Sequence, residues 1–191
     1  MEQNKEMTAQ QSLSIIAETL NNSRRDILRS SSKYFILWGI ILTILSLAIY
    51  LSWHLSGNPA WNFLWFAMPA IGYPLAALLG KKDRGLPKSE LGRMIGGTWT
   101  AFGAFALCLS AIAVFAVPMH VTLIIVIILG LAESMSGVIL KNWPIITAGF
   151  ILGVGGAVFA MLVESEAQLL IFTLGGALLA ITGLIVKYQY K

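Results

Sequence analysis

The sequence predicts an all-α membrane protein with six transmembrane helices, arranged as three antiparallel hairpins and preceded by an N-terminal amphipathic cytoplasmic helix. Three observations predict this fold class: the composition, the lengths of the apolar runs and the distribution of basic residues. Of the 191 residues, 57% are apolar and 12% are charged, whereas soluble domains have about 25% charged residues. The mean hydropathy is +0.78. A soluble globular domain is therefore excluded.

Six apolar runs account for most of the chain, and each is close to the roughly 20 residues that a helix needs to cross a bilayer. They lie at about 34–53, 61–80, 94–117, 122–140, 143–163 and 168–186, so that 34–187 is the transmembrane domain and 188–191 a cytoplasmic tail. The short loops predict antiparallel neighbours. In the tightest loop, Asn142 can cap the next helix and Pro144 fits its first turn.

The basic residues predict the orientation. All 13 lysines and arginines lie in the N-terminal segment, the second loop, the fourth loop and the tail. The intervening loops, around 54–60, 118–121 and 164–167, have none. Because basic residues accumulate on the cytoplasmic side of a membrane, both termini are expected in the cytoplasm.

The polar segment 1–33 has a helical apolar stripe that contains Leu13, Ile16, Leu20 and Ile27. Two interpretations remain open for it. In the first, the helix lies on the membrane surface, with basic side chains that contact lipid headgroups. The residues of that contact are Arg24, Arg25, Arg29 and Lys33. In the second, residues 8–30 dock a cytoplasmic partner or another subunit.

The second run contains Pro69, Gly72 and Pro74 near its middle. Proline removes a backbone donor, so this span is expected to kink or break. A structural kink is one interpretation. A broken helix that forms a transporter binding site is the other.

The stretch 129–137 contains the one acidic residue within the six runs, Glu133. Gly130, Glu133, Ser134 and Gly137 are spaced so that they share one helix face, which is narrow enough for a neighbouring helix to approach closely. A carboxyl group buried there requires a partner or a proton. These four residues form the candidate intramembrane polar site.

Glu133 supports three interpretations of different class. It could be structural, protonated by burial and bonded to a hydroxyl across a helix interface. It could instead be the site of a proton-coupled transporter of small solutes, or part of a cation pathway along the axis of an oligomer. For the structural interpretation, the candidate hydroxyl partners are Thr98, Thr100, Thr147 and Thr182.

Internal repeats are indicated in the second half of the chain. A shift of 46 residues aligns Gly130 with Gly176 and Gly137 with Gly183, which makes the fourth and sixth spans look like duplicates. A shift of 53 residues aligns the third span with the fifth, for example Gly96 with Gly149. Both shifts predict a parallel repeat of a helical hairpin.

Residues 94–187 resemble the HdeD-like bacterial six-span membrane proteins. The resemblance rests on Ser136-Gly137 and Thr182-Gly183, which end two helices rich in small residues, and on the turn at Trp143. It implies a six-span architecture in a bacterial inner membrane. This family is associated with acid resistance, and the resemblance implies no chemistry for this chain.

No motif indicates an enzyme, a cofactor or nucleic acid as a partner, and His54 and His120 are too isolated to predict a metal site or an acid sensor. Gly153, Gly155 and Gly156 lie inside a span, where they predict helix packing rather than a phosphate loop. We therefore expect a non-enzymatic protein with a structural, regulatory or stress-related role, contacting lipid and forming a homo-oligomer. A proton-coupled transporter or channel that uses Glu133 is the alternative.

Overall fold

The computed structural model describes residues 9–80, 90–117 and 119–190, and every regular element among them is helical. Six helices are long and apolar enough to cross a membrane, which confirms this part of the prediction. The elements are α1 (Ala9–Ser56), η1 (Pro59–Phe66), α2 (Ala67–Gly80), α3 (Glu90–Phe115), α4 (Val121–Leu140), α5 (Trp143–Phe150), the π-helix η3 (Ile151–Gly155), α6 (Gly156–Leu162) and α7 (Leu169–Gln189).

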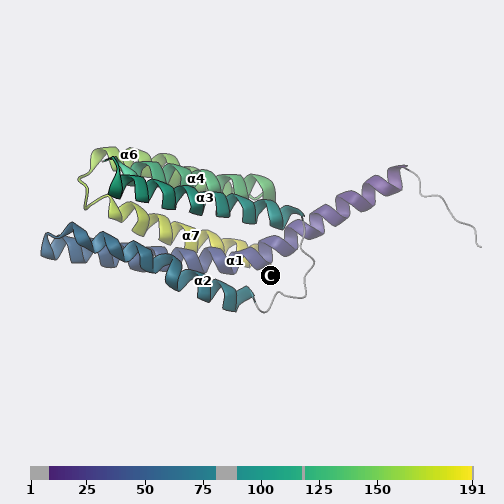
Figure 1. Cartoon of the computed structure of the whole chain (residues 1–191). Helices are drawn as coiled ribbons and strands as arrows, with labels where there is room; N and C mark the ends of the chain where they lie inside the picture. Colours follow the sequence, from purple (N-terminus) through teal and green to yellow (C-terminus); the bar gives the residue numbers. More distant parts are fainter. Residues whose placement is uncertain (1–8, 81–89, 118, 191) are drawn as a thin grey trace, which may run out of the picture.

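The first helix differs from the expectation of a separate surface helix before the first span. α1 is one unbroken helix of 48 residues, and its N-terminal part extends beyond the bundle (Figure 1). No proline or glycine lies between Ala9 and Gly39, so nothing in the sequence interrupts the helical hydrogen bonds there. The amphipathic stretch and the first span therefore form one element.

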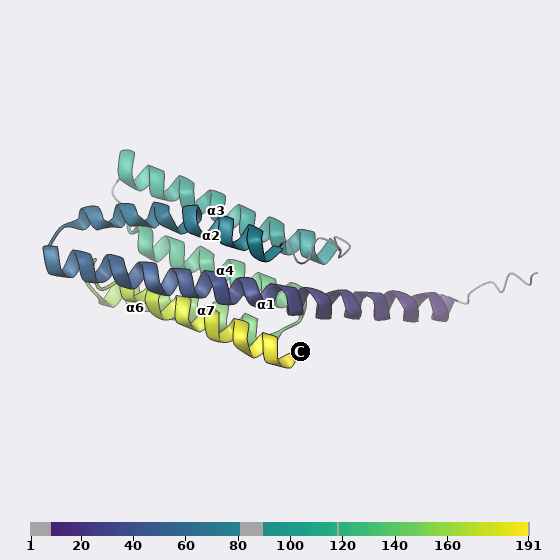
Figure 2. The same cartoon turned by 90° about the horizontal axis from the view of Figure 1, so that it is seen from below.

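The core consists of α1, α4, α7 and the fifth span, formed by α5, η3 and α6. α1 packs most extensively against α7, so the first and last spans are neighbours, and α4 packs next most extensively against α5. Figures 1 and 2 show α2 and α3 on the outside of this group. α3 has no buried residue and α2 has one, Gly72.

The two closely packed pairs, α7/α1 and α4/α5, have the same backbone contact. A Cβ atom added to Gly39 would lie 2.5 Å from the backbone nitrogen of Ala180, and one added to Gly149 would lie 2.5 Å from that of Ser134. Likewise, a Cβ atom on Gly176 would meet the Gly39 carbonyl, and one on Gly130 the Gly149 carbonyl. The pairs therefore correspond, with α7 matching α4 and α1 matching the fifth span.

This correspondence supports the shift of 46 residues and replaces the shift of 53. α1 and the fifth span match at an offset of 110 residues, which relates Gly39 to Gly149 and Ile36 to Ile146. The third span does not match, because a Cβ atom on Gly96 would meet nothing within 4 Å. Successive spans alternate in direction, and matching helices lie an even number of spans apart in the chain. The matching helices therefore run in the same direction, and the repeat is parallel.

The expected break in the second span is not where the sequence predicted it. α2 continues through Pro69, Gly72 and Pro74, and the change of helix type comes earlier, where η1 ends at Phe66. Gly72 provides the space for the Trp38 ring of α1, which a Cβ atom would overlap. This glycine therefore serves packing.

Candidate functional site

Glu133 lies on the buried side of α4 and is completely enclosed, with 0% of its surface exposed. α4 runs from Val121 to Leu140, and the next residue, Lys141, has a left-handed backbone conformation with a φ of 51°. Nine of its residues are buried, at helical spacing: Val126, Leu129, Gly130, Ala132, Glu133, Ser134, Ser136, Gly137 and Leu140. The helical repeat that buries the apolar residues therefore also buries the carboxyl group.

Three of the four predicted site residues pack against the fifth span. Gly130 lies against Gly149 and Gly153, and the Ser134 hydroxyl donates to the carbonyl of Ile146 at 3.4 Å. Gly137 lies against the backbone of Ile146. The predicted close helix approach is confirmed.

Glu133 differs from these three residues because neither of its carboxyl oxygens has a hydrogen-bond partner among the residues that the structure describes. The four threonines proposed as partners donate to carbonyls of their own helices. The pairs are Thr98 with Met94, Thr100 with Gly96, Thr147 with Trp143 and Thr182 with Leu178. A buried polar group without a partner costs about 1–3 kcal/mol, so the Glu133 carboxyl lowers the stability of the folded protein.

The other half of the repeat has an apolar residue at the matching position. The shift of 46 residues places Leu179 of α7 opposite Glu133, and Leu179 is buried. Leu179 belongs to a cluster that includes Phe35 of α1 and Leu140 of α4, so it lies between the two pairs. The correspondence predicts the same position for Glu133, between the two halves, where an apolar side chain would satisfy the packing.

Aromatic side chains lie at the depth of Glu133. Phe102 of α3 and Glu133 are almost equally distant in sequence from the turn that joins α3 to α4, which places them at similar depths in antiparallel helices. Trp99 packs against both apolar clusters of the core. Its ring makes edge contacts with Phe35, at 6.4 Å between centroids, and with Phe102, at 5.8 Å.

The fifth span contains a feature that sequence reasoning missed. Residues Ile151–Gly155 form a π-helix, and Gly153 within it lies against Gly130, about one turn from Glu133. Short π-helical segments are rare and occur frequently at functional sites. In the sequence, this segment is marked by the run Gly153, Gly155 and Gly156, which by itself predicts only helix packing.

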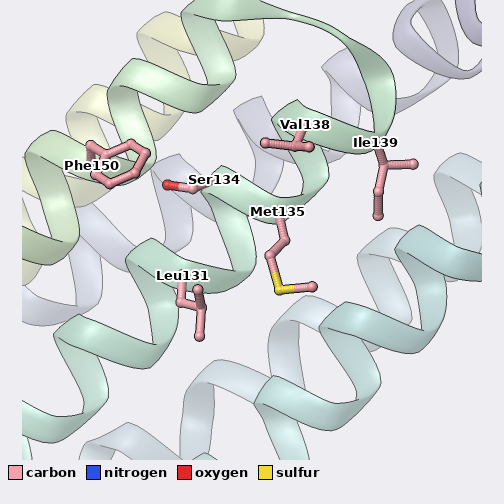
Figure 3. A pocket seen from close by; sticks show the side chains of 6 residues that line it. All are labelled: Leu131, Ser134, Met135, Val138, Ile139 and Phe150. Carbon is pink, nitrogen blue, oxygen red and sulfur yellow. The ribbon is translucent and has the colours of Figure 1, made fainter.

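A shallow groove of about 260 Å³ lies on the outer side of the α4/α5 pair (Figure 3). It is apolar, and its residues are Leu131, Ser134, Met135, Val138, Ile139 and Phe150. Glu133 does not line this groove. Access to the carboxyl would therefore require movement of a helix.

The basic residues predicted to contact lipid headgroups lie along α1 where it leaves the bundle. Arg25 and Arg29 are exposed, whereas Arg24 and Lys33 are partly buried. The Lys33 ammonium donates to the Leu79 carbonyl at 3.2 Å and lies over the Tyr34 ring. Lys33 therefore also connects α1 to the end of α2.

At the opposite end of the bundle, His54 and Glu166 are 3.0 Å apart, Nδ1 to Oε1. The Tyr50 ring stacks on the imidazole. His120 immediately precedes α4, and no such pair involving it is found among the described residues. Within the described residues, no three histidine, cysteine or acidic side chains come together as metal ligands.

Comparisons with protein-family models, with curated proteins and with solved structures found no match to this chain. The resemblance to HdeD-like proteins therefore stays a prediction from the sequence. Among the described residues, the structure shows six helices long and apolar enough to cross a membrane and an enclosed carboxyl group, that of Glu133.

Proposed function

We propose that this chain is a small, non-enzymatic carrier of solutes in a membrane, which exchanges a proton at Glu133. One observation supports the proposal most strongly: the Glu133 carboxyl is enclosed and has no hydrogen-bond partner among the described residues, at the position where the matching helix α7 has Leu179. Carriers built from parallel repeats hold their substrates near the membrane midplane, at the interface between the repeats.

The absence of a hydroxyl partner argues against a purely structural role. A carboxyl that stabilised a helix interface would bond across it, as Ser46 and Thr173 do at 2.9 Å between α1 and α7. An ionisable group retained at a cost inside a membrane is, by default, a functional site. The π-helix beside Gly130 adds to this argument, since such segments accompany functional sites.

Proton exchange is tested by carbodiimide modification and by proton flux. Dicyclohexylcarbodiimide should modify Glu133 in the purified protein, as found by mass spectrometry, and should block proton movement in proteoliposomes. Glu133→Gln should lose both signals while melting like the parent. Glu166→Gln removes a partly exposed carboxyl outside the core as a control and should keep both.

A structural, regulatory or stress-related role is the second candidate. It is favoured by the complete enclosure of Glu133 and by the backbone contacts that hold both pairs together. If the parent neither reacts with carbodiimide nor moves protons, and Glu133→Gln behaves identically, this candidate replaces the carrier.

The setting of the protein is part of the proposal. The chain resides in a bacterial inner membrane with both termini in the cytoplasm, contacts anionic lipid and assembles as a homo-oligomer, with residues 8–30 available to a cytoplasmic partner. In a Cys108→Ala background, new cysteines at Asn58 and Ser165 should react with an impermeant reagent on intact cells. One at Ser89, which lies outside the described residues, should not. The reverse labelling would overturn the orientation.

A further inference from the structure

We propose that the solute exchanged at Glu133 is a monovalent, lipophilic organic cation, held between the carboxylate and the aromatic rings of α3. This inference rests on the proposed carrier function and names its substrate class. It combines the unpartnered carboxyl with the aromatic side chains of α3 that pack against the core clusters containing residues of α4.

Within the described residues, the helices packed against α4 have no basic side chain at the level of Glu133. The helices packed against α4 have their ionisable side chains near their ends or on an exposed surface. These are Glu90, Arg93 and the exposed Cys108 on α3, and Lys187 and Tyr188 on α7. Arg93 is already paired with Glu90 at 2.9 Å. The positive charge must therefore come from the ligand.

One carboxylate neutralises one charge, which favours a monovalent ligand. A metal cation such as Ca²⁺ requires six to eight oxygen ligands, and the described residues bring no group of three metal-ligating side chains together. An organic cation requires fewer polar contacts because its carbon surface is satisfied by apolar packing. The apolar core around Glu133 fits this class.

The aromatic rings fit the same class. Trp99 and Phe102 pack against the core, and the Trp99 ring makes edge contacts with Phe102 and with Phe35 of α1. An organic cation over the face of such a ring is attracted by its quadrupole, and tryptophan binds best. A carboxylate with tryptophan and phenylalanine nearby therefore favours a cation over a neutral solute or an anion.

α3 is the helix whose movement would admit the ligand. None of its 26 residues is buried, whereas half of the apolar window of α4 is buried. The helices of the two close pairs are held backbone to backbone and cannot separate without losing those contacts. The exchange is balanced in charge: protonated Glu133 releases one proton, and the carboxylate formed binds one cation.

The test uses tetraphenylphosphonium as the probe and tetraphenylborate, an anion of the same shape, as its control. The purified full chain should bind the phosphonium ion, release one proton for each ion bound, and ignore the borate. Affinity should fall about tenfold for each pH unit below the titration of the carboxyl, because one proton competes with one cation.

Variants separate the two contributions. Glu133→Gln should abolish binding, and Trp99→Leu should weaken it at least tenfold while Trp99→Phe retains most of it. Trp61→Leu, on the exposed η1 helix, is the matched control and should bind like the parent. Melting temperatures identify any variant that fails to fold; if Trp99→Leu does, Phe102→Leu takes its place and should likewise weaken binding.

The outcomes distinguish this inference from the proposed function. Proton exchange at Glu133 without phosphonium binding, or equal binding of phosphonium and borate, would overturn the cation assignment and leave the carrier proposal intact. A parent protein that neither exchanges protons nor binds phosphonium would overturn both proposals. Binding that is unchanged in Glu133→Gln would also overturn the cation site.

Discussion

The α4/α5 pair and the α7/α1 pair have the same backbone contact but surround it with different side chains. In α7/α1, the Thr43 hydroxyl lies 3.3 Å from the Thr173 carbonyl, and Ser46 bonds to Thr173. In α4/α5, Gly153 takes the place of Thr43, and a Cβ atom there would lie 3.7 Å from the matching carbonyl, that of Ile127. Both pairs have a hydroxyl bond across the helix interface, but α7/α1 has two at this level, whereas α4/α5 has a glycine there.

This difference coincides with the placement of the carboxyl group. The pair that has the π-helix and Gly153 also contains Glu133, whereas the pair with the two hydroxyl bonds has Leu179 at the matching position. Interhelical hydrogen bonds in membranes contribute about 0.6 kcal/mol each on average. We infer that α7/α1 is the more rigid half and that α4/α5 is the half adapted for function.

The largest effect is expected where the two pairs are alike. Gly39→Val and Gly149→Val should each destabilise the protein by about 3 kcal/mol or more, because the added Cβ meets backbone that cannot move aside. Thermal unfolding in detergent measures the loss. Gly96→Val is the control, since its Cβ would meet nothing within 4 Å. If only one of the two valine variants were destabilised, the two helix pairs would not have the same backbone contact.

The next effect concerns the position at which the pairs differ. Glu133→Leu should raise the free energy of unfolding by about 1–3 kcal/mol, because the matching Leu179 shows that leucine fits and an unpartnered carboxyl is removed. Glu133→Gln should change it little. Denaturation in detergent gives both values, and a leucine variant less stable than the parent would indicate a partner for the carboxyl.

A smaller effect is expected from the hydroxyl bonds. Thr43→Val and Thr173→Val should each lower stability by about 0.6 kcal/mol, because each removes interhelical hydrogen bonds of α7/α1 without changing the volume much. The double variant should be less than additive, since both residues share one network. Full additivity in thermal unfolding would show that the two hydroxyl groups act separately.

The smallest effect is expected at the exposed end of α7/α1. Glu166→Gln should cost less than about 1 kcal/mol, because the pair with His54 is partly exposed and screened by solvent. Unfolding curves of the two proteins at low and high salt provide the measurement. A loss of several kcal/mol would show that this contact, rather than the backbone approach, holds the first and last spans together.

Hydropathy and the spacing of neighbouring residues were sufficient to predict the spanning helices, the start of α5 and the small-residue face of α4. Six runs of about 20 apolar residues predicted six spanning helices, and Asn142 and Pro144 predicted the start of α5, where the Asn142 side chain accepts from the Ile145 amide at 3.2 Å. The small residues on α4 predicted close packing. Each of these follows from hydropathy or from hydrogen bonding within one turn, which neighbours in sequence decide.

Which helices pack against each other is visible only in the three-dimensional structure. An apolar helix face does not specify which helix it packs against. The sequence therefore did not predict the pairing of α1 with α7, the offset of 110 residues or the outer position of α3. The same limit applied to Glu133: its spacing showed that it was buried, but whether a hydroxyl met it depended on every helix around α4. Long-range contacts, rather than periodicity, left its carboxyl without a hydrogen-bond partner among the described residues.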